Sequence, residues 1–88
     1  MRIKVHYLST MKQTAGTAEE TYELPAHGTV AELLRLVVQA HGDHMRQLVY
    51  TDDGSVMPSC FRNGASLTAQ SVLADGDAVE AVLMLSGG

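Results

Sequence analysis

The 88-residue chain has one cysteine, few basic residues and no long apolar run. A single cysteine, Cys60, excludes an internal disulfide framework, a four-cysteine zinc site and a four-cysteine iron–sulfur cluster. Six Lys and Arg residues against ten Asp and Glu leave a net charge of −4, which argues against nucleic acid and better suits a basic protein partner. No apolar stretch approaches the roughly 18 residues that cross a bilayer. Since the sequence opens on a strand pattern, we also expect no signal peptide. We therefore expect a cytoplasmic protein with neither nucleic-acid nor membrane partners.

The size and composition of the chain predict one small folded domain over residues 1–88. Hydrophobic residues make up 45% of the sequence, which is normal for a globule and excludes a disordered chain. Such a length supports one modest core but not a buried active site with a lid. No repeat, low-complexity segment or internal boundary divides it.

The first half of the chain predicts a hairpin followed by a helix. Residues 1–8 alternate between apolar and polar, and so do residues 19–24, which is typical of half-buried strands. The polar segment 12–18 between them reads as a loop, so we expect an antiparallel pair. Thr29 and Glu32 have the spacing of a capping box at a helix start. An apolar stripe at helical period then follows, made of Val30, Leu33, Leu34, Val37 and Val38. Gly42 is placed to end this helix in a left-handed cap.

The second half predicts short strands around tight turns. In chain order we expect an irregular turn over 43–50, a third strand over 56–62, a short strand or helical turn over 66–73 and a last strand over 78–85. Pro58 cannot donate to a ladder, which favours an edge or bulged position for the third strand. Asn63-Gly64 is a strong tight-turn signal. This order is that of an α+β β-grasp fold, a mixed sheet of about four to five strands packed on one main helix. The first and last strands can then pair in the middle of the sheet.

The sequence ends in a diglycine, and we expect residues 85–88 to form a flexible tail: Leu85, Ser86, Gly87 and Gly88. Glycine has no Cβ, so these residues can enter a channel too narrow for other residue types. The carboxylate of Gly88 is then unhindered and suited to activation by another enzyme. Taken alone, the diglycine is more typical of a frayed end or an expression remnant.

The ordered set of motifs resembles a known family over nearly the whole length. The residues that carry the likeness are the opening strand Met1–Leu8, the helix start Thr29–Leu34, Asn63-Gly64, Leu73 ahead of Asp75–Asp77, Val79 and Gly87-Gly88. Together they resemble the sulfur-carrier branch of the ubiquitin-like β-grasp families, the MoaD/ThiS family, most closely the small subunit of molybdopterin synthase. The likeness favours a functional reading of the tail.

The resemblance implies a carrier and not an enzyme in its own right. A ubiquitin-activating-type adenylyltransferase would use ATP to form an acyl-adenylate at Gly88, and sulfur from a persulfide-bearing sulfurtransferase would convert it to a thiocarboxylate. The tail would then insert into the large subunit of molybdopterin synthase, which would hold the catalytic residues. Two alternatives stay open. One is a sulfur carrier for cysteine or thiamine synthesis; the other is a ubiquitin-like modifier or a noncovalent docking module.

A partner needs a surface to bind, and the strand patterns suggest one. If Val79, Ala81 and Leu83 face the helix, Val82 and Met84 face away, on the same side as Leu8. These three would form an exposed apolar patch beside the tail, which Leu67 would extend. The alternative is that a loop covers this second face.

The remaining reactive residue types predict no further site. His41 and His44 lie close in sequence, but no cysteine or carboxylate cluster accompanies them at zinc spacing, so we expect solvated surface histidines and no metal. Cys60 sits in a predicted strand without basic neighbours, which favours a small packing residue. We expect no bound cofactor.

Overall fold

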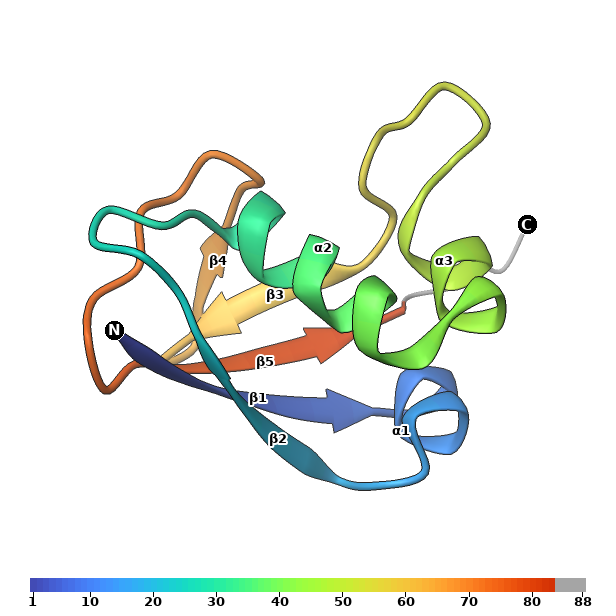
Figure 1. The fold of residues 1–88 in the computed structure, drawn as a ribbon, viewed down its shortest axis with the longest axis horizontal. Coiled ribbons are helices and arrows are strands. Elements are labelled where there is room, and N and C mark those ends of the chain that lie inside the picture. Colours follow the sequence, from blue (N-terminus) through green and yellow to red (C-terminus); the bar gives the residue numbers. More distant parts are fainter. Residues whose placement is uncertain (84–88) are drawn as a thin grey trace.

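A computed structural model describes residues 1–83 (Figure 1). Its elements are β1 (Arg2–Leu8), α1 (Thr10–Ala15), β2 (Glu19–Glu23), α2 (Val30–His41), α3 (Asp43–Val49), β3 (Ser59–Arg62), β4 (Ala65–Leu67) and β5 (Ala78–Val82). The five strands form one sheet in the order β2-β1-β5-β3-β4. This is the mixed β-grasp sheet that the sequence predicted.

The first and last strands lie side by side near the centre of the sheet, as expected. β1 and β5 run parallel, with Val5 opposite Val79 and Leu8 opposite Val82. β1 also pairs antiparallel with β2, and β5 pairs antiparallel with β3. The carboxyl end of β5 therefore lies at the same end of the sheet as Leu8 (Figure 1).

The core lies between the sheet and α2. The strand residues predicted to point inward, Ile3, Val5 and Tyr7, are all buried, as are Val79 and Ala81 of β5. They are joined in one cluster by the apolar stripe of α2, in which Leu33, Leu34 and Val37 are fully buried. The helix begins as expected, because the Thr29 side chain accepts a hydrogen bond from the Glu32 backbone N–H at 3.3 Å. Gly42 ends it with a positive φ of 86°, although its ψ of −158° is extended and not the left-handed helical value that we predicted.

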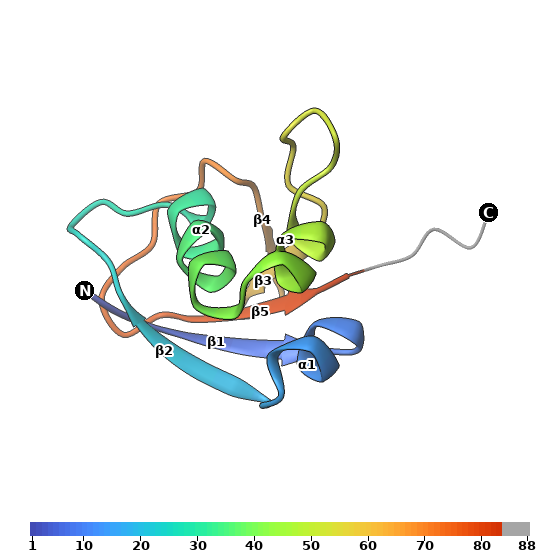
Figure 2. The same cartoon turned by 45° about the vertical axis from the view of Figure 1, so that its right-hand side comes forward.

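Two short helices contradict the sequence prediction. Residues 10–15, most of which was expected to be loop, form α1, and residues 43–49, expected to be an irregular turn, form α3. Each buries only one or two side chains: Met11 in α1, and Met45 and Val49 in α3. Such short elements carry too few buried residues to show a helical period. Figure 2 shows α2 and α3 on one side of the sheet and α1 at the end of β1.

The third strand is shorter than predicted and is not at an edge. β3 begins at Ser59, so Pro58 lies just outside it, and β3 pairs with β5 on one side and β4 on the other. Asn63 and Gly64 form the predicted tight turn to β4, with φ values of 53° and 79°. Over residues 1–83, no helix has the length and apolar character needed to cross a membrane.

Candidate docking surface and tail

The sheet has a second face, opposite α2, that carries apolar side chains at the carboxyl end of β5. Leu8 of β1 lies directly opposite Val82 of β5, and directly paired residues point to the same face. Leu8 is 41% exposed and Val82 is half-buried. The predicted juxtaposition of these two residues is therefore confirmed.

A third apolar residue joins them that sequence reasoning did not find. Phe61, the only phenylalanine in the chain, follows the buried Cys60 in β3 and lies opposite Glu80 of β5. Because alternate strand residues point to opposite faces, Phe61 faces away from α2 and is half-buried there. We call Leu8, Phe61 and Val82 the outer patch. The sequence held a signal for this position: Cys60 was predicted to pack inward, so the next residue of the strand, Phe61, should point to the opposite face.

The prediction that Leu67 extends this patch is wrong. Leu67 lies opposite Cys60 in the β3–β4 pair, and Cys60 in turn lies opposite the buried Ala81. Leu67 therefore points to the α2 side, where it packs against the core. It belongs to the other face of the sheet.

The alternative in which a loop covers the second face is also contradicted, for the residues that the structure describes. Lys4, Leu8, Ala78 and Glu80 all point to this face, and all are exposed. The face is therefore open along the central strands.

The tail itself lies outside the described residues. Met84, predicted as part of the patch, and Leu85, Ser86, Gly87 and Gly88, predicted to insert into a partner, stay predictions. Leu83 packs partly against the core, as expected for a residue in step with Val79 and Ala81.

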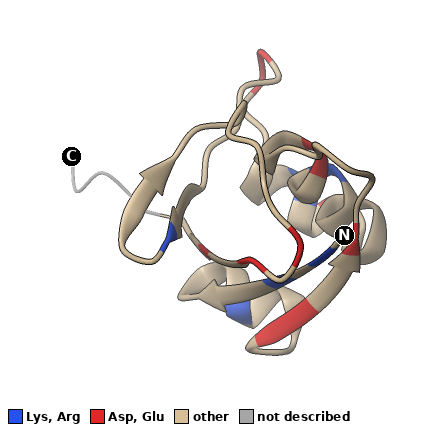
Figure 3. Ribbon diagram, turned by 90° about the vertical axis from the view of Figure 1, so that its left-hand side faces the viewer, with Lys and Arg blue, Asp and Glu red and all other residues tan. Residues whose placement is uncertain are grey.

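Charged side chains on this face of the sheet form opposite-sign pairs. Arg2 lies 3.2 Å from Glu23, and Glu19 is contacted by Lys4 at 3.9 Å and by His6 at 3.4 Å. Within residues 1–83, Lys and Arg are scattered along the ribbon and form no continuous stripe (Figure 3). This distribution does not favour a phosphate backbone as ligand.

The hollow on this face is separate from the outer patch. A depression of about 440 Å³ is lined by residues at the amino end of β1 and in the 75–77 turn, including Arg2, Lys4 and Asp75. None of the three outer-patch residues lines it. The patch consists of partly exposed apolar side chains on the open face of the sheet, which is typical of a protein-binding surface.

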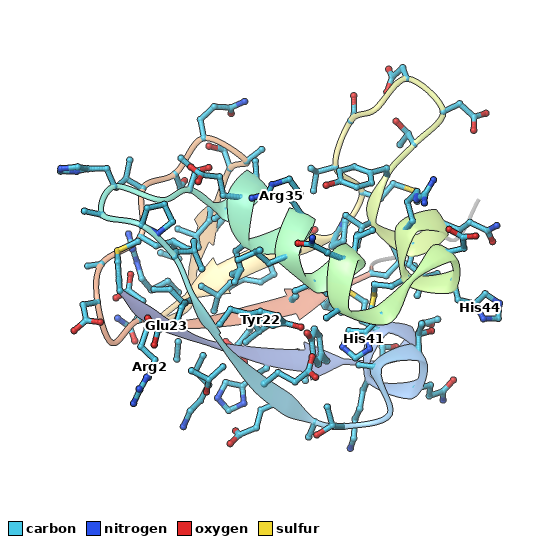
Figure 4. All side chains as sticks on the ribbon, viewed as in Figure 1. Arg2, Tyr22, Glu23, Arg35, His41 and His44 are labelled. Carbon is cyan, nitrogen blue, oxygen red and sulfur yellow. The ribbon has the colours of Figure 1, made fainter. Side chains whose placement is uncertain are left out.

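On the opposite side of the sheet, one carboxylate oxygen gathers side chains from three elements. Glu20 of β2 accepts hydrogen bonds from the hydroxyls of Tyr7 at 2.7 Å and Tyr22 at 2.8 Å, and His41 Nε2 lies 2.6 Å from the same oxygen. The rings of Tyr7 and His41 meet edge to face, with centroids 6.2 Å apart. Figure 4 shows His41 at the end of α2 beside the strands. We call these four residues the Glu20 cluster.

The pKa values of the Glu20 cluster reflect this packing. Partial burial alone would raise the pKa of Glu20, but the hydrogen bonds from His41, Tyr7 and Tyr22 outweigh it and hold the pKa below its usual value. Burial raises the pKa of Tyr7 strongly and that of Tyr22 to about 12. Glu20 is therefore ionised and both phenols are protonated at neutral pH.

His41 is not the solvated surface histidine that was predicted. Its side chain is only 15% exposed and is held by Glu20. Cys60 is buried, as predicted, and burial raises its pKa to about 11, which makes it unreactive. No group of three or more His, Cys, Asp or Glu side chains within residues 1–83 is arranged to hold a metal ion.

Comparison with solved structures confirms the fold. The chain is similar to small archaeal modifier protein 1 of Haloferax volcanii, with a TM-score of 0.88, 23% identity and coverage of 100% of both chains. It is similar to a Pyrococcus furiosus protein assigned as subunit 1 of a molybdopterin converting factor, with a TM-score of 0.79, 27% identity and coverage of 97% of this chain and 99% of that one. A third likeness is to the crystal structure of the Amycolatopsis orientalis BexX/CysO complex, with a TM-score of 0.67, 19% identity and coverage of 98% and 99%. No protein-family model matches the chain, and no curated protein matches it by sequence.

Proposed function

We propose that this chain, a ubiquitin-like β-grasp protein by its fold, is a sulfur carrier. Its reactive group would be the Gly88 carboxylate. The observation that carries the proposal is the position of β5. This strand lies in the centre of the sheet, and its carboxyl end lies beside the outer patch. A partner that binds the outer patch is therefore close to the start of residues 84–88. The scaffold provides the binding area, and the diglycine provides the acyl group.

The chemistry proposed for Gly88 has two stages. The carboxylate attacks the α-phosphorus of ATP on a ubiquitin-activating-type adenylyltransferase, and pyrophosphate leaves. The terminal sulfur of a persulfide on a sulfurtransferase then attacks the acyl carbon and releases AMP. A thiol cleaves the resulting acyl disulfide, which leaves a thiocarboxylate on Gly88 and a disulfide on the donor side. In this scheme the carrier binds no cofactor itself, and the catalytic residues belong to its partners.

Molybdopterin synthesis is the pathway that we propose for the loaded carrier. The likeness to the Pyrococcus furiosus protein, which is assigned as a molybdopterin converting factor subunit, supports this choice. The acceptor would be a molybdopterin synthase large subunit, into which residues 85–88 insert. Ordering these residues costs about 1–2 kcal/mol each in backbone entropy. Contacts at the outer patch would offset that cost.

A second function is favoured by a different likeness. The Haloferax volcanii protein with the highest TM-score of the three is named as a modifier. In that role, a lysine amine of a target would attack the activated Gly88 and form an isopeptide bond. Cysteine or thiamine synthesis are further pathways for a sulfur carrier of this fold.

Intact-protein mass spectrometry separates these functions. The chain would be incubated with the adenylyltransferase of its own organism, ATP and a persulfide donor. A sulfur carrier gains the mass difference between sulfur and oxygen, whereas a modifier yields a ladder of much heavier conjugates. A variant lacking Gly88 is the control: it should keep the thermal stability of the parent and lose all loading. If neither product forms, or if deletion of Gly88 unfolds the domain, the proposal fails.

A further inference from the structure

One acidic side chain lies among the residues of the outer patch. Glu80 of β5 is exposed and points away from α2, directly between His6 of β1 and Phe61 of β3 in the strand register. Val82 and Leu8 form the next row on the same face. Apolar residues therefore adjoin this carboxylate on two sides.

The charge of Glu80 is not used within residues 1–83. The basic groups on this face are already paired: Arg2 with Glu23, and both Lys4 and His6 with Glu19. Glu80 makes no ion pair and no side-chain hydrogen bond with the rest of the described chain. Water solvates the carboxylate while the face is open.

Binding of a partner changes this situation. A protein that covers the outer patch removes water from Glu80, and an ionised carboxylate that loses its water without gaining a counter-charge is strongly unfavourable. A guanidinium fits the position best, because it can pair with the carboxylate and also stack on the Phe61 ring beside it. An acidic or wholly apolar partner surface would be rejected.

We propose that Glu80 selects the partners of this face, and that they present an apolar surface with an arginine opposite it. This inference rests on the proposed function, since it assumes that the activating enzyme binds the outer patch. It goes beyond that function by naming the charge that the partner must carry. Glu80 is thus a specificity residue for docking and takes no part in the chemistry at Gly88.

The test compares two charge reversals on one face. Glu80→Lys and Glu23→Lys change the net charge equally, but Glu23 lies at the other end of β2 and already pairs with Arg2. Binding to the adenylyltransferase is measured by calorimetry, and loading by intact mass. We expect Glu80→Lys to weaken binding by about 100-fold and Glu80→Gln by about tenfold. Glu23→Lys should weaken it by less than about threefold.

Rescue identifies the partner residue. Among single Arg→Glu variants of the adenylyltransferase, one should bind E80K better than it binds the parent chain. Equal losses of affinity for E80K and E23K would mean that only the net charge matters. Unchanged affinity of E80K would show that Glu80 is not at the interface. Either result overturns the inference. If the parent chain itself is neither bound nor loaded, the proposed function fails instead. The thermal stability of each variant checks that the fold is kept.

Discussion

Two glutamates on neighbouring regions of one sheet have opposite surroundings. Glu20, on the α2 side, accepts hydrogen bonds from Tyr7 and Tyr22 and contacts His41. Glu80 lies on the face of the sheet opposite α2, which we call the outer face, and has no such partner within residues 1–83. The first carboxylate holds together elements of this chain, whereas the second is available to another molecule.

The contrast extends to the faces that carry these residues. On the α2 side, every buried polar side-chain atom of the described chain has a hydrogen-bond partner, and the apolar residues form one closed core. On the outer face, Leu8, Phe61 and Val82 remain partly open to solvent. One face of a sheet can stay exposed to solvent when the other face packs against a core that stabilises the fold.

The largest expected difference between the faces comes from two adjacent residues of β5. Ala81→Asp places an unpaired carboxylate in the core, where Ala81 is fully buried, and should cost about 3–5 kcal/mol in the free energy of unfolding. Val82→Asp places the same group on the outer face and should change that free energy by less than about 1 kcal/mol. Urea denaturation measures both. If Val82→Asp destabilises the domain as much as Ala81→Asp, the outer face is not open.

The two glutamates themselves give the next comparison. Glu20→Gln removes the charge that binds His41 and should cost about 1–3 kcal/mol at neutral pH, because a hydrogen-bonded ionised group is lost. Glu80→Gln removes a solvated charge and should change the free energy of unfolding by no more than about 0.5 kcal/mol. Equal effects in the same denaturation experiment would contradict the assignment of internal and external roles.

Acid should destabilise the domain in part through Glu20. The pKa of Glu20 in the folded chain lies below its usual value of 4.5, so its contribution is fully present above that pH and is lost as the pH falls through the folded pKa. Glu20→Gln should therefore make the acid decline in stability shallower. Some decline remains, because the pKa of Asp77 is also lowered: burial would raise it, but the Ala74 N–H and Arg62 outweigh that effect. An unchanged acid profile in the variant would show that Glu20 does not contribute.

How much of this could be predicted from the sequence depends on the length of each pattern. β1, β2 and α2 each carry several residues in strict alternation or at helical spacing, so their existence and inward faces were predicted. The helices α1 and α3 were missed because each has too few buried residues to show a helical period, and those residues are buried only by the packing of the rest of the fold. The third strand was expected at an edge or with a bulge because Pro58 was counted as part of it, whereas β3 begins after Pro58.

The Glu20 cluster shows what a single sequence leaves hidden. Tyr7, Glu20 and His41 come from three separate elements, and only the packing of α2 across the β1–β2 pair brings them together. One signal was available. Glu20 and the inward-facing Tyr22 are two residues apart in one strand and therefore point to the same face, which places a carboxylate on the core side. A glutamate in that position needs partners, and a search for them would have pointed to buried donors.

An effect smaller than that of Glu20→Gln separates the members of the Glu20 cluster. Tyr22→Phe removes the hydrogen bond to Glu20 and the 3.3 Å contact with the Tyr7 hydroxyl. It leaves the contacts of Glu20 with Tyr7 and His41, so we expect a loss of about 0.5–1.5 kcal/mol in the free energy of unfolding. Tyr50→Phe is the matched control, because Tyr50 is half-buried and its hydroxyl makes no side-chain hydrogen bond within residues 1–83; its effect should be smaller. If Tyr22→Phe lowers the free energy of unfolding as much as Glu20→Gln does, the cluster acts as one cooperative unit. The ionised carboxylate alone would then not account for the difference between the α2 side of the sheet and the outer face.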